Sequence, residues 1–154
     1  MKLTLVRGLP GSGKTTLAEK LAKESGAVVV SADDFFMVEN EQTNSIEYKF
    51  SFALIKAAHQ YCTGMAFYHL YRGKDVIVAN TFTQKWEICP YIEMAAINNI
   101  SWEVVEPKTK WKNDVDECAN KNTHGVSATA VQKMKDRWES TKDILKYAEE
   151  KGWA

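Results

Sequence analysis

A glycine-rich segment near the start of the chain constrains the fold more than any other feature. Residues 8–15 read GLPGSGKT and fit the pattern G-x-x-x-x-G-K-[ST] at every fixed position. The segment lies between a short apolar run, Lys2–Val6, and a stretch with helical spacing marked by Leu17 and Leu21. In this strand–loop–helix context the pattern is typical of a P-loop, in which backbone N–H groups and a helix amino terminus face a phosphate group.

The loop residues have distinct expected roles. Glycine lets the backbone turn and approach a phosphate closely, Lys14 is expected to reach the β- and γ-phosphates, and the Thr15 hydroxyl to ligate Mg²⁺. The sequence therefore predicts ATP and Mg²⁺ as cofactors. The expected nucleotide-binding residues of the loop are Gly8, Leu9, Pro10, Gly11, Ser12, Gly13, Lys14, Thr15 and Thr16.

Short apolar runs alternate with longer segments of helical periodicity along the rest of the chain. Strands are expected at Lys2–Val6, Ala27–Ser31, Asp75–Ala79 and Ser101–Glu106, each bounded by turn-forming residues. The alternation predicts an α/β fold of the P-loop NTPase type, with a mostly parallel central sheet and helices on both faces. Ligands of such folds bind at the carboxyl ends of the strands.

Four helical regions are expected. The first follows the P-loop, and a third runs from about residue 84 to 98 with Thr83 as its N-cap. The second is long, and its repeating large residues predict a core-facing stripe. The carboxyl-terminal region supplies one or two helices. The long-helix stripe is Phe50, Leu54, Ala57, Tyr61, Met65 and Tyr68, and the carboxyl-terminal seam is Val131, Met134, Trp138, Leu145 and Ala148.

Length and composition predict one domain, residues 1–154, in a cytoplasmic protein. The 20 basic and 20 acidic residues balance, so any nucleic-acid partner needs a local binding patch. No stretch approaches the about 20 apolar residues of a membrane span, and no obligate protein partner is inferred. Cys62, Cys89 and Cys118 lack metal-ligand spacing and are expected to be reduced thiols in or near the core.

Two adjacent carboxylates, Asp33 and Asp34, follow the second expected strand. At a strand end beside the P-loop, one could accept the proton of an attacking hydroxyl and the other could help to hold the metal. Capping of the next helix is the competing interpretation, and it is compatible with catalysis. Asn80 and Thr81 end the third expected strand, where an acidic Walker B residue would be expected; they could orient substrate or cap the following helix.

Several segments together resemble a known group. GLPGSGKTT, the paired aspartates, ANTFTQKWE, EPKTKWKND and KNTHGVS occur in this order. The chain is similar, over nearly its whole length, to the kinase domain of bacteriophage polynucleotide 5′-hydroxyl kinases and their small P-loop relatives. The same branch includes phage kinases that phosphorylate 5-hydroxymethyluracil in DNA.

The resemblance implies roles for particular residues. Asp33 would be the general base, and Lys14 and Thr15 would keep their P-loop roles. Without an acidic Walker B residue, metal binding would rely on Thr15, phosphate oxygens, water and Asp33 or Asp34. The segment Trp111–His124, within a lid of about residues 108–126, would close over ATP. In that lid Lys121 would supply catalytic positive charge where the family carries arginine, and His124 would contact the nucleotide.

The sequence does not decide which hydroxyl accepts the phosphoryl group. Phe36 stands where polynucleotide kinases place an arginine that holds the acceptor phosphate, which leaves room for a base stacked on Phe35 or Phe36. A basic strip, Lys108, Lys110 and Lys112 around Trp111, could bind a nucleic-acid backbone or be a solvated loop with one anchoring tryptophan. The sequence favours an ATP-dependent kinase acting on a nucleic-acid hydroxyl, DNA ahead of RNA. The alternatives are a nucleoside or nucleotide kinase and a P-loop ATPase or switch module.

Overall fold

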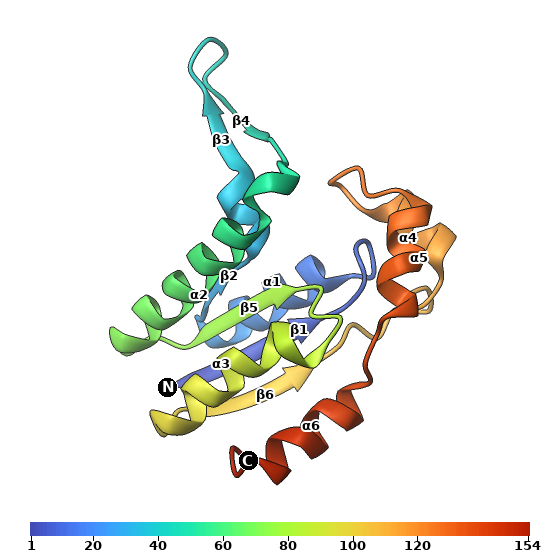
Figure 1. Ribbon diagram of the computed structural model, residues 1–154. Coiled ribbons are helices and arrows are strands. Elements are labelled where there is room, and N and C mark those ends of the chain that lie inside the picture. The colour runs from blue at the N-terminus through green and yellow to red at the C-terminus, as the bar shows by residue number, and fades with distance from the viewer.

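Four parallel strands form the central sheet of the computed structural model, which describes residues 1–154 (Figure 1). The strands are β1 (Lys2–Arg7), β2 (Val28–Val30), β5 (Val76–Asn80) and β6 (Ser101–Val105), in the order β2-β5-β1-β6. Every neighbouring pair is parallel. The four expected strands are therefore confirmed to within two residues at each end, and their carboxyl ends meet at one edge of the sheet.

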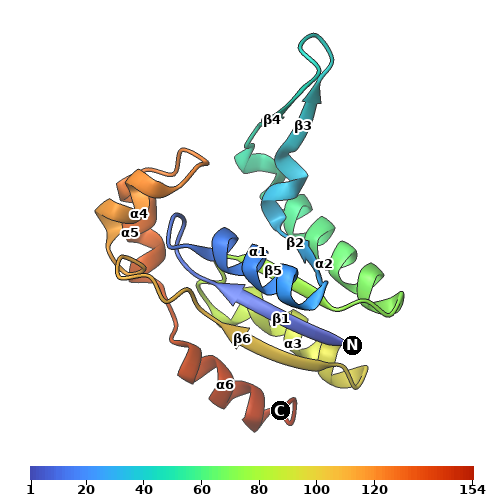
Figure 2. The same cartoon turned by 180° about the vertical axis from the view of Figure 1, so that it is seen from behind.

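Helices cover both faces of this sheet (Figures 1 and 2). Helix α1 (Lys14–Ser25) lies on one face, and α2 (Ile55–Tyr71), α3 (Lys85–Ile97) and α6 (Thr141–Glu150) lie on the other. Strand side chains alternate accordingly: Leu3 and Leu5 enter the larger core under α2 and α3, whereas Val6 packs with Ala18 of α1. Each fully buried Leu or Val side chain stabilises the fold by roughly 1.5–3 kcal/mol. The expected α/β fold is confirmed.

A hairpin that the sequence analysis missed rises beyond the sheet between β2 and α2 (Figure 1). It pairs β3 (Met37–Asn40) with antiparallel β4 (Ser45–Tyr48). A five-residue 3-10 helix, η1 (Ala32–Phe36), leads into it, and a second, η2 (Phe52–Leu54), leads out to α2. The hairpin strands are short and mostly exposed, so they carry little of the buried alternation by which a strand is recognised.

The expected core stripe of α2 is wrong by one position. The buried residues of this helix are Ala58, Cys62, Ala66 and Leu70, whereas Tyr61 and Tyr68 are exposed. Small side chains at four-residue spacing let the helix axis approach the sheet closely, and the larger aromatic rings then lie at the rim of the contact. Phe50, at the start of the expected stripe, precedes the helix and packs on Phe36.

Two further expectations about helices need correction. The N-cap of α3 is Gln84, which forms a capping box with Glu87, while the Thr83 hydroxyl donates to the Glu87 carboxylate. In the carboxyl-terminal region, α4 (Val115–Lys121) and α5 (Ala128–Asp136) precede α6. The seam residues Val131 and Ala148 are buried as expected. Leu145 is 40% exposed, because its neighbour Ile144 takes the core position of α6.

Arg7, at the carboxyl end of β1, is completely buried and ties distant parts of the chain together. Its guanidinium donates to the carbonyls of Phe82 and Thr83 and to the Thr141 hydroxyl, and it lies 3.9 Å from the centre of the Trp138 ring. Burial lowers the pKa of Arg7 to about 10, and nearby glutamates oppose that shift. Arg7 thereby fixes the turn after β5 and the start of α6 against the sheet.

The three cysteines are free thiols and all are buried, as expected. Burial raises the pKa of each thiol. None of the helices combines the length and the apolar character that crossing a membrane requires.

Candidate active site

The P-loop connects β1 to α1 at the carboxyl edge of the sheet. Gly11 and Gly13 have φ values of 76° and 108°, in the left-handed region that favours glycine. A Cβ atom added at Gly11 would lie 2.2 Å from the Cys118 carbonyl oxygen, and one at Gly8 would lie 2.5 Å from Ser12 Oγ. The loop therefore requires glycine at position 11, and a side chain at position 8 would displace the Ser12 hydroxyl.

The start of α1 leaves hydrogen-bond donors free beside this loop. Gly13, the N-cap residue, offers no side-chain acceptor to the helix. The backbone N–H groups of Lys14, Thr15 and Thr16 donate to no other group of the chain. Unpaired N–H groups and the helix dipole together favour an anion here.

The buried hydroxyl of Ser12 is a second feature that suits an anion-binding loop. Its side chain is completely buried, and Ser12 Oγ is the one buried side-chain polar atom with no hydrogen-bond partner. An unsatisfied buried hydroxyl costs roughly 1–3 kcal/mol. A phosphate oxygen held by the loop would accept its proton, so the residues fit the phosphate group that the motif predicts.

Lys14 folds back over the P-loop. Its ammonium donates to the Leu9 carbonyl at 3.1 Å. Burial lowers the pKa of Lys14 to about 8, while the nearby Asp33 and Cys118 act in the opposite direction. Lys14 is thus a half-buried cation held mainly by one carbonyl, and bound phosphate would supply a negative charge next to it.

Asp33 and Asp34 both lie in the η1 turn, but their side chains make different contacts. Asp34 Oδ2 accepts from the Ser31 backbone N–H at 3.0 Å, while Ser31 Oγ accepts from the Asp33 N–H at 3.2 Å. This reciprocal capping box confirms that Asp34 caps the turn. Burial, followed by the Asp33 charge, raises the pKa of Asp34, and the Ser31 hydrogen bond opposes the shift.

Asp33 points away from the cap toward the hairpin and the lid. Its Oδ1 accepts from the Tyr48 hydroxyl at 2.9 Å, and its Oδ2 lies 3.5 Å from His124 Nε2. The Tyr48 and His124 rings are tilted by 31° with centres 4.1 Å apart. Burial, together with the Asp33 charge, raises the pKa of Tyr48, so its hydroxyl stays a donor. The hairpin and the α4–α5 loop therefore meet over this carboxylate (Figure 1).

The sequence analysis missed Tyr48, because the hairpin that carries it was not expected. It also gave Asn80 a more general role than the structure shows. Asn80 Oδ1 accepts from the Ala32 N–H at 2.9 Å and from Ser31 Oγ at 3.4 Å, and Asn80 is buried at the end of β5. Asn80 does not cap α3; it fixes the turn that carries Asp33.

The start of the segment expected to form the lid, residues 108–126, packs directly on the P-loop. Thr109 Oγ1 donates to the Ser12 carbonyl at 2.7 Å, and Trp111 Nε1 donates to the Gly11 carbonyl at 3.0 Å. Trp111 also packs against buried Leu9 and Cys118. Trp111 is thus the anchoring tryptophan of the basic strip, and its indole N–H is not available to a nucleic acid.

Lys121 and His124 differ in position. Lys121 Nζ lies 4.4 Å from the centre of the Trp111 ring and 3.9 Å from Glu117 Oε2. Its neighbour Trp111, rather than Lys121 itself, contacts the P-loop. His124 instead contacts Asp33, with 3.5 Å between its Nε2 and Asp33 Oδ2. Asn122 accepts from Val126 N–H and donates to the carbonyls of Cys118 and Val126, which holds the loop between α4 and α5 in shape.

The aromatic residues after Asp33 do not both face solvent. Phe36 is 5% exposed and packs on Tyr48 and Phe50, which excludes it as a platform for a base. Phe35 is half-buried and contacts Tyr61. The expectation of stacking on Phe36 is therefore wrong, because this ring anchors the hairpin.

Mg²⁺ would find few ligands in the protein itself. The chain holds no cluster of three or more His, Cys, Asp or Glu side chains that could bind a metal ion. Thr15 is exposed at the start of α1, and Asp33 and Asp34 lie on η1. Mg²⁺ commonly keeps several waters and binds through one or two protein groups plus substrate phosphates, so this donor set fits a metal that enters with a nucleotide.

Comparison with known proteins agrees with this geometry. The fold and the loop define an α/β protein with a P-loop. A family model described as an AAA domain matches residues 3–141, and the chain belongs to that family.

Two curated relatives cover most of this chain. Human NEDD4-binding protein 2 is 32% identical over 140 residues, spanning 89% of this chain and 8% of that protein. Rat 2′,3′-cyclic-nucleotide 3′-phosphodiesterase is 32% identical over 147 residues, spanning 93% of this chain and 32% of that protein. The chain thus spans a third or less of the length of these relatives.

Solved structures share the fold. A chain of the Pnkp1/Rnl/Hen1 RNA repair complex has a TM-score of 0.66 at 18% identity, covering 97% of this chain and 45% of that one. A kinase-like protein of Chloroflexus aurantiacus has a TM-score of 0.64 at 20% identity, covering 89% of this chain and 76% of that one. At these identities the likeness establishes the fold.

Proposed function

We propose that residues 1–154 form an ATP-dependent kinase domain that transfers the γ-phosphoryl group to a hydroxyl of a nucleic acid, with residues 108–126 as its lid. The single observation that carries the proposal is the position of Asp33. This carboxylate lies at the edge of the sheet that carries the P-loop, held by Tyr48 and facing His124 of the lid. A carboxylate at this position can accept the proton of an attacking hydroxyl.

The proposed reaction is an in-line displacement. The acceptor oxygen attacks the γ-phosphorus as its proton passes to the Asp33 carboxylate, and the bond to the β–γ bridging oxygen breaks to release ADP. The P-loop N–H groups, Ser12 and Lys14 hold the phosphates, and Thr16 lies in the same helix turn. Mg²⁺ would neutralise charge on the phosphate oxygens, with Thr15 and Asp34 as the protein ligands that the sequence predicts. Lys121 and His124 approach from the lid.

The acceptor class rests on the family resemblance and on the likeness to a chain of an RNA repair complex. We propose DNA before RNA as the acceptor. The hydroxyl that is phosphorylated would be a 5′-hydroxyl or the hydroxymethyl group of a modified base. A free nucleoside or nucleotide is the nearer alternative. The phosphodiesterases named above match over 32% of their length, so their named activity does not carry over with this match.

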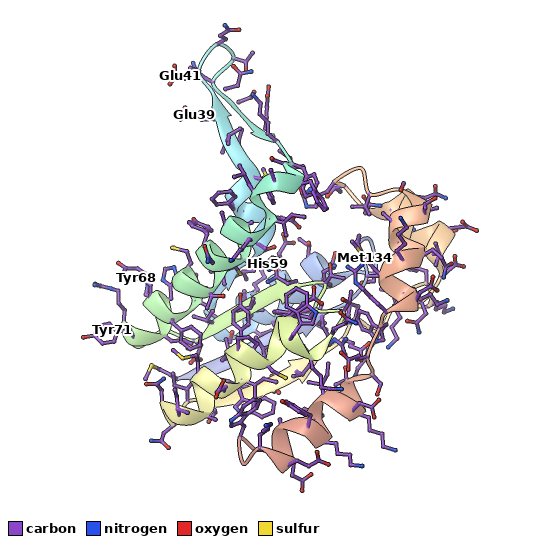
Figure 3. All side chains as sticks on the ribbon, in the orientation of Figure 1. Glu39, Glu41, His59, Tyr68, Tyr71 and Met134 are labelled. Atoms are coloured by element: carbon purple, nitrogen blue, oxygen red, sulfur yellow. The ribbon has the colours of Figure 1, made fainter.

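Transfer of label from γ-³²P-ATP tests the proposal. The acceptors are 5′-hydroxyl DNA and RNA, DNA with 5-hydroxymethyluracil, and free nucleosides. Label should enter a nucleic acid, Lys14→Ala should abolish transfer, and Asp33→Asn should lower kcat by at least about 100-fold. Glu41→Gln, at the exposed hairpin tip (Figure 3), is the matched loss of a carboxylate and should change nothing. Release of phosphate with no labelled acceptor would instead support the ATPase or switch module.

A further inference from the structure

We propose that the groove between α2 and α3 binds a single-stranded segment of the nucleic-acid acceptor beside the nucleotides that reach Asp33. The proposal rests on the proposed function and adds a binding surface to it. The groove has a volume of about 370 Å³ and lies between the first halves of the two helices. Helix α3 begins just after β5 and α2 leads into β5, so these halves lie at the carboxyl edge of the sheet, which also carries Asp33.

Trp86 provides a stacking surface at this groove. Its side chain is 69% exposed, although it is one of the largest apolar groups of the chain. The indole Nε1 donates to Gln84 Oε1 at 2.9 Å, and Gln84 is the N-cap of α3, so the ring is held in place. No aromatic ring of the protein stacks on it. A fixed indole with a free face is the kind of surface on which a nucleobase stacks.

The charges along the groove suit a phosphate backbone. Lys56 lies on its α2 wall and forms no ion pair within the chain, and His59 lies one turn further along the same wall. The one acidic group of the lining, Glu87, is occupied, because its Oε2 accepts from the Thr83 hydroxyl and the Gln84 N–H. Lys56 is therefore the one charged side chain of the lining that no group of the chain engages, and it can pair with a phosphate.

Gly64 forms part of the floor of the groove. It lies inside α2, where glycine destabilises a helix relative to alanine. A Cβ atom added there would meet nothing within 4 Å. No backbone conformation or close packing requires glycine at this position. The floor of the groove opposite Trp86 is therefore open and leaves room for a base.

The lining favours a nucleic acid over a protein segment. Two of the nine lining residues are hydrophobic, and the α2 wall presents the polar groups of Lys56, His59, Gln60 and Thr63. One fixed aromatic ring, a free lysine and neutral polar groups instead match a base and its phosphates. Figure 3 labels His59 in the half of α2 nearer the hairpin and Tyr68 and Tyr71 toward the other end, away from the groove.

Fluorescence anisotropy of a labelled single-stranded oligonucleotide of about ten nucleotides tests the proposal. Trp86→Ala should raise its Kd by at least about fivefold, and Gly64→Phe should do the same by filling the floor. Gly64→Ala and Tyr71→Ala are the matched controls, the second removing an aromatic ring that is 92% exposed, and both should bind as the wild type does. Unchanged affinity in Trp86→Ala and Gly64→Phe, or no binding by the wild type, would overturn the proposal.

Label transfer separates this proposal from the proposed function. With a mononucleotide acceptor, Trp86→Ala should keep the wild-type KM, whereas with the oligonucleotide its KM should rise, because only the longer acceptor reaches the groove. Equal KM changes for both acceptors would overturn the groove assignment while leaving the kinase intact. If the wild type labels neither acceptor, the kinase proposal fails, and the anisotropy series alone then decides the groove.

Discussion

The Tyr48 hydroxyl donates a 2.9 Å hydrogen bond to Asp33 Oδ1, and so connects the end of the hairpin to the proposed general base. Tyr48 also packs against Phe36, which is buried at the foot of the hairpin. The hairpin is therefore part of the site rather than an appendage. A carboxylate on a short 3-10 turn needs an external contact to fix its direction, and Tyr48 supplies it.

Tyr48→Phe removes this hydroxyl and keeps the ring. We expect kcat for phosphoryl transfer to fall by about tenfold, equivalent to about 1.4 kcal/mol, because the hydrogen bond orients a charged group. Affinity for ATP should not change. Steady-state transfer and nucleotide titration measure the two quantities, with Tyr71→Phe at the exposed end of α2 as control. A fall in ATP affinity without a fall in kcat would place Tyr48 in the nucleotide site instead.

The sequence predicted the sheet well and the site in part, for identifiable physical reasons. The buried parallel strand β5 is apolar from Val76 to Ala79 and is bounded by turns. The P-loop pattern is specific enough to predict its own backbone conformation. Asp33 could be placed because it follows a strand of that sheet. Tyr48 could not, because its role depends on a short, exposed hairpin and on contacts to residues far along the chain.

The α2 stripe shows the limit of periodicity. Tyr61 and Cys62 both belong to four-residue repeats, and side-chain size favoured the tyrosine series. The structure buries Cys62, because a close approach between helix and sheet selects small residues. For Lys121, the sequence predicted the segment to which it belongs but not its contact with the Trp111 ring. That contact depends on the hydrogen bond that anchors the ring to Gly11.

Gly11→Ala tests the contact between the P-loop and the lid. The new Cβ would lie 2.2 Å from the Cys118 carbonyl oxygen, in addition to the strain of a φ of 76°. We expect a loss of stability of at least about 3 kcal/mol, since backbone strain of about 1–3 kcal/mol adds to the overlap. Urea unfolding measures it.

Gly26→Ala is the control for this substitution. Gly26 has a nearly equal φ of 75° but open space around an added Cβ, so it reports the cost of the left-handed backbone alone, about 1–2 kcal/mol. The difference between the two variants isolates the contact with Cys118. Equal losses would mean that the lid moves away from the P-loop at no cost.

Asn80→Ala tests whether β5 positions the Asp33 turn. The substitution leaves the Ala32 N–H without its 2.9 Å acceptor, and an unsatisfied group of this kind costs about 1–3 kcal/mol. We expect that loss in urea unfolding together with a lower kcat, because the turn carries the base. Asn98→Ala, at the exposed end of α3, removes a hydrogen bond to the Met94 carbonyl and should affect neither kcat nor, beyond about 1 kcal/mol, stability. Normal kcat in a destabilised Asn80→Ala protein would limit Asn80 to folding.

The protonation state of Lys14 couples nucleotide binding to proton uptake. Burial lowers its pKa from 10.5 to about 8 in the free protein, so the folded chain holds fewer protons than the unfolded chain between these values. The stability of the free protein should therefore rise as the pH rises from about 8 toward 10.5. Phosphate oxygens of bound ATP favour the charged form and raise this pKa again.

Binding of ATP at pH 8 should then take up about half a proton, because about half of the Lys14 side chains are neutral there before binding. Isothermal titration calorimetry in buffers of different ionisation enthalpy measures the uptake. It should shrink toward zero at pH 6.5, where Lys14 is already charged, and Lys14→Arg should abolish it, because a guanidinium stays protonated. Binding at pH 8 with no proton uptake in the wild type would show that Lys14 is charged before ATP arrives, and that the Leu9 carbonyl and the Asp33 charge together outweigh its burial.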